Sequence, residues 1–275
     1  MRVAVAGHIE WIWFARVERV PVAGEIAHAS DSWEEAAGGG AVAAVQLVKL
    51  AGGADFFTAV GADELGRRSV AQLEAQGVTV YAAAREGPQR RGFTFLDAAG
   101  ERAITVVGER LAPHGADPLP WERLADTGAV YFTAGDADAL RTARAARVLV
   151  GTPRARDALA TAGVVLDALV LSATDADERA WAAGLDPPPR LVVYTEGAKG
   201  GRFAASEGTS GTYAATPLPG PLVDAYGCGD SFAAGLTYAL GAGEPIDTAL
   251  GLAARCGAAC LTGRGPFAGQ LTLPG

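Results

Sequence analysis

Short apolar runs alternate with helix-like patterns along most of the chain, and this alternation constrains the fold more than any other feature. Strands that alternate with helices form a largely parallel sheet covered by helices on both faces. We therefore expect an α/β fold in a single domain over residues 1–275: a doubly wound, mostly parallel central sheet flanked by helices. The predicted strands are 2–6, 56–60, 78–82, 129–133, 147–150, 168–171 and 191–195, and the clearest predicted helices are 41–50, 64–76, 229–240 and 245–262.

Two segments break this alternation and indicate a second, smaller sheet. Residues 13–28 alternate apolar and polar side chains. Residues 93–97 and 102–106 do the same on either side of an Ala-Ala-Gly turn, which is typical of a β-hairpin. We expect these segments, over about 13–30 and 91–107, to form a small β-sheet lid that projects beside an active site. Its exposed edges suggest a homodimer in which the lid sheets of two copies pair.

Composition and charge exclude several classes of protein. Hydrophobic residues make up 49% of the chain, enough for a sizeable core, and no apolar run reaches the about 18 residues of a membrane helix. The net charge of −8 and the lack of a long basic run argue against partners such as nucleic acid or a membrane surface. The chain starts with a short strand rather than a leader peptide, so we expect a cytoplasmic protein. The three cysteines and three histidines lack metal-ligand spacing.

Segment 224–235, DAYGCGDSFAAG, is expected to mark the point where an extended stretch turns into a helix. The N–H groups of Gly227, Cys228 and Gly229 would lie at the helix N-terminus, where backbone donors lack partners and the helix dipole is positive. Such an end is a site for phosphate, because small residues let the anion approach the backbone. No P-loop motif occurs, and the G-x-G-x-x-A match at 263–268 follows a helix, so we discard it.

Asp230 places a carboxylate within this predicted anion site, where it would repel a phosphate. It could act as a helix cap, since Asp stabilises helix starts. Its position one step after G-x-G favours another role, in which Asp230 accepts a proton beside a transferring phosphoryl group. Cys228, at the same helix start, is expected to have a lowered thiol pKa and to be prone to oxidation.

Segment 224–235 resembles the C-terminal signature of the ribokinase-like sugar kinases, the phosphofructokinase B family. Four further segments resemble motifs of this family and occur in the family's order. They are the lid-strand P-x-x-G-E at 21–25, the glycine turn of the substrate pocket at 37–41, G-x-D-x-x-G at 61–66 and the T-x-G-x-x-G nucleotide loop at 195–200. The resemblance covers nearly the whole chain and implies a ribokinase-like fold. It also implies an ATP-dependent kinase that transfers the γ-phosphoryl group to a hydroxymethyl group of a sugar or sugar-like substrate.

The same resemblance implies roles for particular residues. Asp230 would take the proton from the attacking hydroxyl group, and Gly227, Cys228 and Gly229 would supply the N–H donors of an anion hole. Two further sets of residues would bind the two substrates. The nucleotide set is Thr195, Gly197, Lys199, Gly200 and Cys256, and the acceptor set is Glu10, Gly38, Gly39 and Val42.

The resemblance implies ATP and Mg²⁺ as cofactors and allows a monovalent cation. Asp175 and Glu178 align with the family's N-x-x-E pair, which acts on Mg²⁺ through water. An acidic first turn of a helix explains these two residues equally well.

Several positions depart from the family pattern, and most concern the acceptor. The aspartate expected five residues after Gly7 is Ile12, and the pocket asparagine is Val42. The D-P-N-x-R element has become Gly-Thr-Pro-Arg at 151–154, without its acid. Glu10 is the nearest acid, and it would either replace the aspartate or be a simple exposed residue. Because each hydroxyl contact contributes roughly 0.5–1.5 kcal/mol, we expect a sugar that is held differently or a less polar ligand, such as a nucleoside or modified sugar.

Trp11, Trp13 and Phe14 suit ring stacking on such a ligand, and packing within the lid sheet explains them as well. Three alternatives to the sugar kinase stay open at this point. The first is a nucleoside kinase of the same family. The second is a catalytically silent ligand-binding or regulatory relative, which the missing polar pocket residues favour and Asp230 opposes. The third is an unrelated dinucleotide-binding α/β protein.

Overall fold

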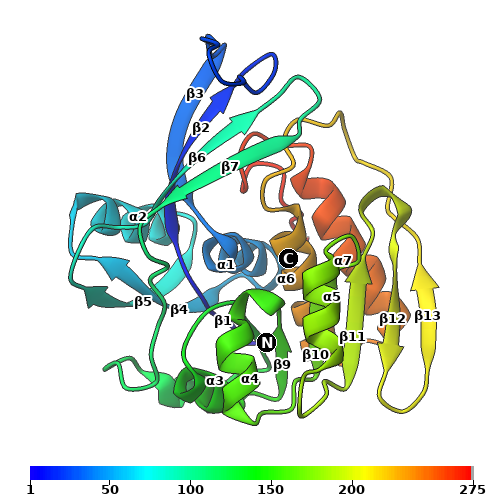
Figure 1. Ribbon diagram of the computed structural model, residues 1–275. Helices are drawn as coiled ribbons and strands as arrows, with labels where there is room; N and C mark the ends of the chain where they lie inside the picture. Colours follow the sequence, from blue (N-terminus) through cyan, green and yellow to red (C-terminus); the bar gives the residue numbers. More distant parts are fainter. Residues whose placement is uncertain (274–275) are drawn as a thin grey trace.

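A nine-stranded sheet runs through the centre of the protein, and helices cover both of its faces (Figure 1). The computed structural model describes residues 1–273. The strand order is β13-β12-β11-β10-β9-β8-β1-β4-β5, and all pairs from β11 to β5 are parallel. The strands of this parallel part are β1 (Val3–Ala6), β4 (Ala54–Gly61), β5 (Val78–Arg85), β8 (Ala129–Phe132), β9 (Val148–Gly151), β10 (Ala168–Ser172) and β11 (Leu191–Thr195). The expected doubly wound α/β architecture is confirmed.

Two further strands extend the sheet beyond β11 and were not expected from the sequence. β12 (Gly201–Ala205) and β13 (Ser210–Tyr213) both pair antiparallel to their neighbours. The reversal lets the nucleotide-loop segment between β11 and β12 turn back at the carboxyl end of β11.

The helices divide between the two faces of the sheet, as the two separate core clusters show (Figure 1). One face carries α1 (Gly39–Ala51), α2 (Glu64–Ala75), α6 (Cys228–Ala242) and α7 (Ile246–Cys260). The other carries α3 (Ala137–Ala143), α4 (Arg156–Ala162) and α5 (Ala176–Ala183). Three short 3₁₀ turns complete the main body: η1 (Trp121–Asp126), η2 (Pro153–Ala155) and η3 (Gly197–Lys199). None of the helices within residues 1–273 combines the length and the apolar character needed to cross a bilayer.

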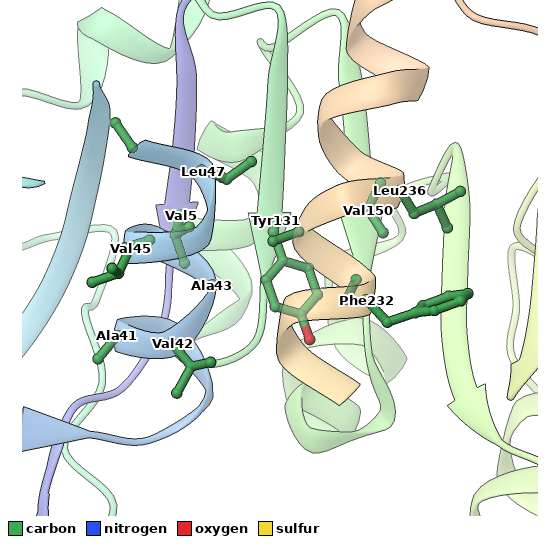
Figure 2. Close-up of a cluster of buried hydrophobic side chains, with 14 of the residues drawn as sticks. Val5, Ala41, Val42, Ala43, Val45, Leu47, Tyr131, Val150, Phe232 and Leu236 are labelled. Carbon is green, nitrogen blue, oxygen red and sulfur yellow. The ribbon is translucent and has the colours of Figure 1, made fainter. Parts of the chain in front are cut away.

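Helices α1 and α6 are held over the sheet by apolar side chains that share one core cluster. Val42 and Leu47 of α1 and Phe232 and Leu236 of α6 are buried in it together with Tyr131 of β8 (Figure 2). Burying a side chain of this size contributes about 1.5–3 kcal/mol. The packing therefore fixes where the N-terminal ends of both helices lie relative to the strands beneath them.

The smaller sheet forms the projecting lid (Figure 1). Its strand order is β3-β2-β6-β7, with β2 (Glu10–Arg16), β3 (Asp31–Ala37), β6 (Arg91–Leu96) and β7 (Arg102–Val107). β2 and β6 are parallel, and the other two pairs are antiparallel. The first lid segment therefore starts earlier and ends later than the expected 13–30. Residues 21–25, expected on a lid strand, instead form a turn between β2 and β3, because Gly24 takes φ 89° and Glu25 pairs with Arg19.

Asp63 and Gln89 fasten the base of the lid to the main body. Asp63 caps α2 by accepting from the Gly66 N–H group (2.9 Å), and its second oxygen accepts from the Gln89 N–H group (3.0 Å). The Gln89 side chain donates to the Ile9 carbonyl (2.7 Å) and accepts from the Gly61 N–H group (2.9 Å). These bonds position the chain just before β6 against the chain just after β1.

Candidate active site

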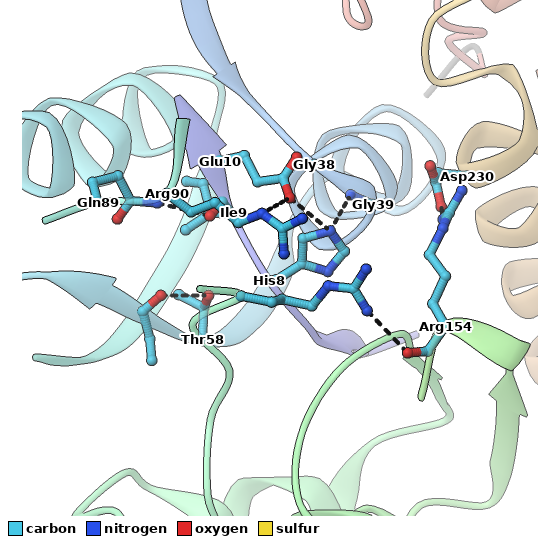
Figure 3. A network of polar contacts seen from close by, with 12 residues as sticks. His8, Ile9, Glu10, Gly38, Gly39, Thr58, Gln89, Arg90, Arg154 and Asp230 are labelled. Carbon is cyan, nitrogen blue, oxygen red and sulfur yellow. Dashed lines mark hydrogen bonds and ion pairs between the residues drawn. The ribbon is translucent and has the colours of Figure 1, made fainter. Parts of the chain in front are cut away.

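Polar side chains from distant parts of the chain meet at the carboxyl ends of β1, β8 and β9 (Figure 3). Ligands of parallel α/β sheets bind at this edge, because loops from neighbouring strands come together there. His8 and Glu10 follow β1, and Arg154 follows β9 on η2. Asp230 enters from the first turn of α6.

The Asp230 carboxylate faces this cluster rather than capping its own helix. The N-cap of α6 is Gly227, and no side chain caps it. Asp230 Oδ1 is contacted by Arg154 Nη1 and lies 3.4 Å from the Tyr131 hydroxyl group, which donates to it. A Cβ atom at Gly39 would lie 2.9 Å from the same oxygen, so only glycine leaves room beside it. The alternative that Asp230 is a plain helix cap is wrong.

Asp230 is nearly buried, with 7% of its surface exposed, and Arg154 is its counter-charge. The carboxylate raises the pKa of Arg154, which therefore stays a cation. Burial, followed by the charge of Asp230, raises the pKa of Tyr131, so this hydroxyl group stays protonated and can donate.

The start of α6 leaves backbone donors free, as expected for an anion site. The first N–H group of this turn to find a backbone acceptor is that of Ser231, which donates to the Gly227 carbonyl (2.9 Å). The N–H groups of Gly227, Cys228 and Gly229 donate to no oxygen within residues 1–273. Gly227 takes φ 82°, and the Gly229 α-carbon faces open space. Three unpaired donors next to a carboxylate are what a phosphoryl-transfer site needs.

Cys228 does not have the lowered thiol pKa expected from its place at a helix start. Burial raises the pKa of its thiol, and the positive charge of Arg102 offsets this only in part. The expectation of an oxidation-prone thiolate is therefore wrong. The thiol is a small, half-buried group in the turn.

His8 is a neutral hydrogen-bond acceptor in this site, and its place at a strand end is the only sequence signal for this role. Its Nε2 accepts from the Gly39 N–H group (3.3 Å). Burial, and then the charges of Arg110, Arg154 and Arg90, hold the pKa of His8 well below its usual range. With Nε2 as acceptor, Nδ1 carries the hydrogen, and this buried donor has no partner within residues 1–273.

Glu10 is buried, so the alternative of a simple exposed residue is wrong. Its Oε1 lies 3.0 Å from Arg90 Nε, and burial raises the pKa of Glu10 against the opposing charges of Arg90, Arg110 and Arg154. Arg110 Nη1 donates to the Arg154 carbonyl (3.1 Å). Arg90 and Arg110 lie in none of the motifs found in the sequence. Arg154 was noted only as the last residue of the altered element at 151–154.

The glycine turn before α1 joins these groups to the start of α6. Gly38, the N-cap of α1, takes φ 90°, and a Cβ atom there would lie 3.2 Å from the Glu10 nitrogen. Its N–H group donates to the Tyr226 hydroxyl group (3.3 Å), next to Gly227. Both turn glycines of the predicted acceptor set therefore lie within the cluster. Val42, in the first turn of α1, is instead fully buried, and its methyl groups fill the space beside Gly227.

The predicted nucleotide loop lies at the carboxyl end of β11. Its turn is closed by the Glu196 N–H group donating to the Gly200 carbonyl (2.8 Å), with φ 58° at Gly197 and φ 82° at Gly200. Thr195 Oγ1 donates to the Leu171 carbonyl (3.3 Å), and Gly197 and Lys199 are exposed. These exposed loop residues fit a bound nucleotide, but no contact within residues 1–273 joins them to Asp230.

Cys256, the remaining residue of the nucleotide set, is fully buried between α7 and α6. A Cβ atom at Gly235 of α6 would lie 2.8 Å from its Sγ. The side chain therefore fills the helix interface, and it would influence a nucleotide only through the position of α7.

Asp175 and Glu178 form the start of α5. Asp175 Oδ1 caps the helix by accepting from the Glu178 N–H group (2.9 Å), and Glu178 Oε2 accepts from the Ser172 N–H group (3.0 Å). The acidic-first-turn alternative thus describes a structural role that both residues have. The second oxygen of each carboxylate is still available to accept a hydrogen bond from water. This fits the water-mediated role toward Mg²⁺, an ion that retains several waters in proteins. No group of three metal-ligating side chains occurs in residues 1–273.

The aromatic residues of β2 pack mostly within the lid. Phe14 stacks on Trp33 (4.9 Å between ring centroids) and meets Tyr226 edge-on (5.1 Å). Trp11 lies under Arg68 and donates to Glu34 (2.7 Å), while Trp13 is half-exposed against Phe93. Lid packing therefore accounts for Trp11 and Phe14, and ring stacking on a ligand is not needed to explain them.

Comparison with known proteins identifies relatives over nearly the full length of the chain. The profile described as pfkB family carbohydrate kinase matches residues 2–272. An ATP-dependent ribose-1-phosphate kinase of Halopiger xanaduensis is 29% identical over 276 aligned positions, which cover 94% of this chain and 91% of that protein.

Solved structures share the fold at lower identity. The ribokinase of Arabidopsis thaliana, complexed with ribose and ATP, superposes with a TM-score of 0.75 at 20% identity, covering 98% of this chain and 96% of that one. The adenosine kinase of Sinorhizobium meliloti gives a TM-score of 0.75 at 19% identity, covering 96% and 95%.

Proposed function

The chain belongs to the pfkB family of carbohydrate kinases, which are phosphotransferases with an alcohol group as acceptor, and we propose that it transfers the γ-phosphoryl group of ATP to a hydroxymethyl group of a sugar-like substrate. The observation that carries this proposal is the Asp230 carboxylate beside the unpaired N–H groups of Gly227, Cys228 and Gly229. This arrangement provides a proton acceptor and an anion site within one helix turn. We take residues 1–275 as one catalytic unit and the cytoplasm, where ATP is available, as its location.

Asp230 acts as the general base in this proposal. It accepts the hydroxyl proton as the acceptor oxygen forms a bond to the γ-phosphorus and the bond from that phosphorus to the β–γ bridging oxygen breaks, releasing ADP. Proton transfer of this kind contributes about 10²–10⁴-fold to a rate. The N–H groups at the start of α6 donate to the oxygens on which charge accumulates. Mg²⁺ would neutralise the phosphates, and Asp175 and Glu178 would hold its waters. The proposal also allows a monovalent cation.

The loop from Thr195 to Gly200 binds ATP in this proposal. Its exposed Gly197 and Lys199 flank the carboxyl end of β11, on the same edge of the sheet as Asp230. A lysine ammonium and backbone N–H groups in a glycine turn are donors that suit phosphate oxygens.

A ribose-bearing molecule is the acceptor class that we favour. The three similar proteins are named for a ribose phosphate, for ribose and for adenosine, which share a ribose unit. A nucleoside kinase is the second candidate, and the adenosine kinase fold match is what favours it. We also propose that two copies pair through the lid, whose outer strands β3 and β7 have unpaired edges within the described sheet.

The test is turnover of Mg-ATP over a panel of pentoses, hexoses, their phosphates and nucleosides, with the Asp230→Asn variant. We expect the variant to lose about 10²-fold or more in kcat while its Kd for ATP stays within about threefold of the parent value. Asp247→Asn is the matched control, because Asp247 lies in the first turn of the neighbouring helix α7 and is exposed. Equal kcat in Asp230→Asn and the parent protein would remove the base from its role. ATP binding without turnover of any acceptor would support the silent relative.

A further inference from the structure

Three arginines from separate segments converge on His8 and Glu10, and Figure 3 shows two of them, Arg90 and Arg154. Arg90 precedes β6 and Arg110 follows β7, so both stand at the base of the lid, while Arg154 follows β9. Arg90 Nε lies 3.0 Å from Glu10 Oε1, Arg110 donates to the Arg154 carbonyl (3.1 Å), and the charges of all three act on both His8 and Glu10. A convergence of this kind needs a reason, because like charges repel. Arg90 is nearly buried, whereas Arg110 and Arg154 are exposed, so a ligand from solvent can reach them.

Carboxylates of the protein balance only two of these three positive charges. Glu10 pairs with Arg90, and the two side chains are only 8% and 12% exposed. Asp230 pairs with Arg154. Arg110 has no carboxylate within ion-pair distance in residues 1–273, and its one side-chain hydrogen bond there goes to the Arg154 carbonyl. Arg110 is exposed, so its positive charge is accessible to a ligand.

Unsatisfied donors gather at the same place. Seven buried side-chain polar atoms lack a hydrogen-bond partner in the described part of the chain, and three of them belong to His8, Arg90 and Thr133. His8 Nδ1 carries a hydrogen, and Arg90 Nε lies near Glu10 without the alignment of a hydrogen bond. Thr133 Oγ1 would lie 3.2 Å from a Cβ atom at Gly39, the residue beside Asp230. Because Arg90 Nε has the Glu10 carboxylate beside it, the donors without any partner are those of His8 and Thr133. Buried polar groups are normally paired, so these two orphans in one cluster indicate a missing ligand.

The missing ligand has the chemistry of an anion with several acceptor oxygens. Both orphan groups can donate a hydrogen, and a guanidinium group has donors only. A phosphate group offers three acceptor oxygens and up to two negative charges, and arginine is the side chain best shaped to bind it.

The sheet order assigns this anion to the acceptor rather than to the nucleotide loop. β1, which ends just before His8 and Glu10, is four strands away from β11, which carries the loop 195–200. At about 4.8 Å per strand, the two places lie roughly 19 Å apart along the sheet edge. Arg90 and Arg110 lie at the β1 end, together with the glycine turn of the acceptor set.

Building on the proposed function, we infer that the acceptor of this kinase already carries a phosphate group, which Arg90, Arg110 and Arg154 bind while its hydroxymethyl group faces Asp230. The same assignment explains the missing acids of the acceptor site. Carboxylates at Ile12 and in segment 151–154 would repel a phosphate, and Arg154 stands in the latter segment. The acceptor is thus more polar than the nucleoside-like ligand that the loss of those acids suggested.

The test compares each sugar with its own phosphate ester as acceptor, using ribose, ribose 1-phosphate and a pentonic acid as probes. We expect kcat/KM for the phosphate ester to exceed that for the free sugar at least 100-fold. In Arg110→Gln this preference should fall at least tenfold, through KM for the acceptor, with KM for ATP within twofold of the parent value. Arg91→Gln is the matched control, because Arg91 is an exposed arginine at the start of β6 and pairs with Val107, at the end of β7 just before Arg110. Thermal unfolding of each variant checks that it is folded.

Each other outcome has a distinct meaning. Turnover that favours free sugars or nucleosides overturns the inference and leaves the kinase intact. Equal kcat/KM for the pentonic acid assigns the cluster to carboxylates, and a raised KM for ATP in Arg110→Gln assigns it to the donor; either result overturns the phosphate site on the acceptor. If no acceptor is turned over, calorimetry decides: ribose 1-phosphate binding that is lost in Arg110→Gln supports the site although the proposed reaction fails, and no binding overturns it.

Discussion

Burial raises the pKa of Glu35, in lid strand β3, to about 7. The Trp33 indole N–H group donates to its carboxylate (2.7 Å) and favours the charged form, while the charge of Asp224 disfavours it. The folded protein therefore binds this proton more tightly than the unfolded chain, whose value is near 4.5. The resulting contribution to stability is complete below about pH 4.5 and is lost as the pH rises through about 7.

Replacing Glu35 with Gln should remove this pH dependence. The shift corresponds to at most about 3 kcal/mol, and we expect about 1–2 kcal/mol because the side chain is partly exposed to solvent. The variant should be more stable than the parent protein at pH 8 by that amount and gain much less at pH 5. Denaturant unfolding at both pH values measures this. Glu18→Gln, at an exposed lid position, is the control, and a gain that is the same at both pH values would contradict the prediction.

At the scale of elements, the start of α6 does more for the site than any other turn. Gly227 takes φ 82° as the N-cap of α6, the helix that carries Asp230 in its first turn. An L-residue in this conformation is strained by about 1–2 kcal/mol. A Cβ atom at Gly227 would also meet Val42 Cγ1 at 2.9 Å. The turn and the packing of α1 against α6 are therefore coupled.

Gly227→Ala should reduce kcat at least tenfold, because relief of the clash with Val42 must move the donors of the anion site. Gly243→Ala provides a matched control, since Gly243 has nearly the same φ (81°) at the other end of α6 and its Cβ would meet nothing within 4 Å. Both variants should lose about 1–2 kcal/mol of stability from backbone strain. Only Gly227→Ala should also lose kcat. Equal kcat in the two variants would show that the turn geometry is not needed.

The sequence predicts the buried strands and the long helices well, because burial imposes a regular pattern on them. β11 has its expected bounds, and α2 and α6 differ from theirs by one or two residues. The pattern fails for β12 and β13, which are only five and four residues long, and β13 (Ser-Gly-Thr-Tyr) lies at the edge of the sheet without an apolar period. It also fails for the turn at 21–25, since alternation alone does not tell a strand from an exposed loop.

At the scale of the whole molecule, the site depends on pairings between segments that are far apart in sequence. Asp230 and the donors of α6 lie in one continuous motif, so the sequence could predict them. His8, Arg90 and Arg110 meet only because β6 pairs with β2 and fixes the lid beside the end of β1. No local pattern encodes that meeting, which is why the arginine cluster emerges only from the fold.

The lid also presents apolar side chains on its edge strand β7, where Ile104 is 43% and Val106 is 44% exposed. If two copies pair through their lids, sedimentation should give the mass of a dimer, and Val106→Lys should shift it toward the monomer. Val165→Lys is the control, because Val165 is 38% exposed in the turn before β10, away from the lid. A parent protein that sediments as a monomer at assay concentration would rule out the pairing.

Arg90 and Arg110 stand at the two roots of the β6–β7 hairpin, and Gly108 already lies against the Arg90 backbone. An anion bound by both side chains would hold the two ends of the hairpin together, so the hairpin could not move while the anion stayed bound. Because the product would keep that anion, product release would require both arginines to lose their contacts with it. Product release, rather than phosphoryl transfer, would then limit kcat. Added salt would raise kcat, because its anions compete for the two arginines.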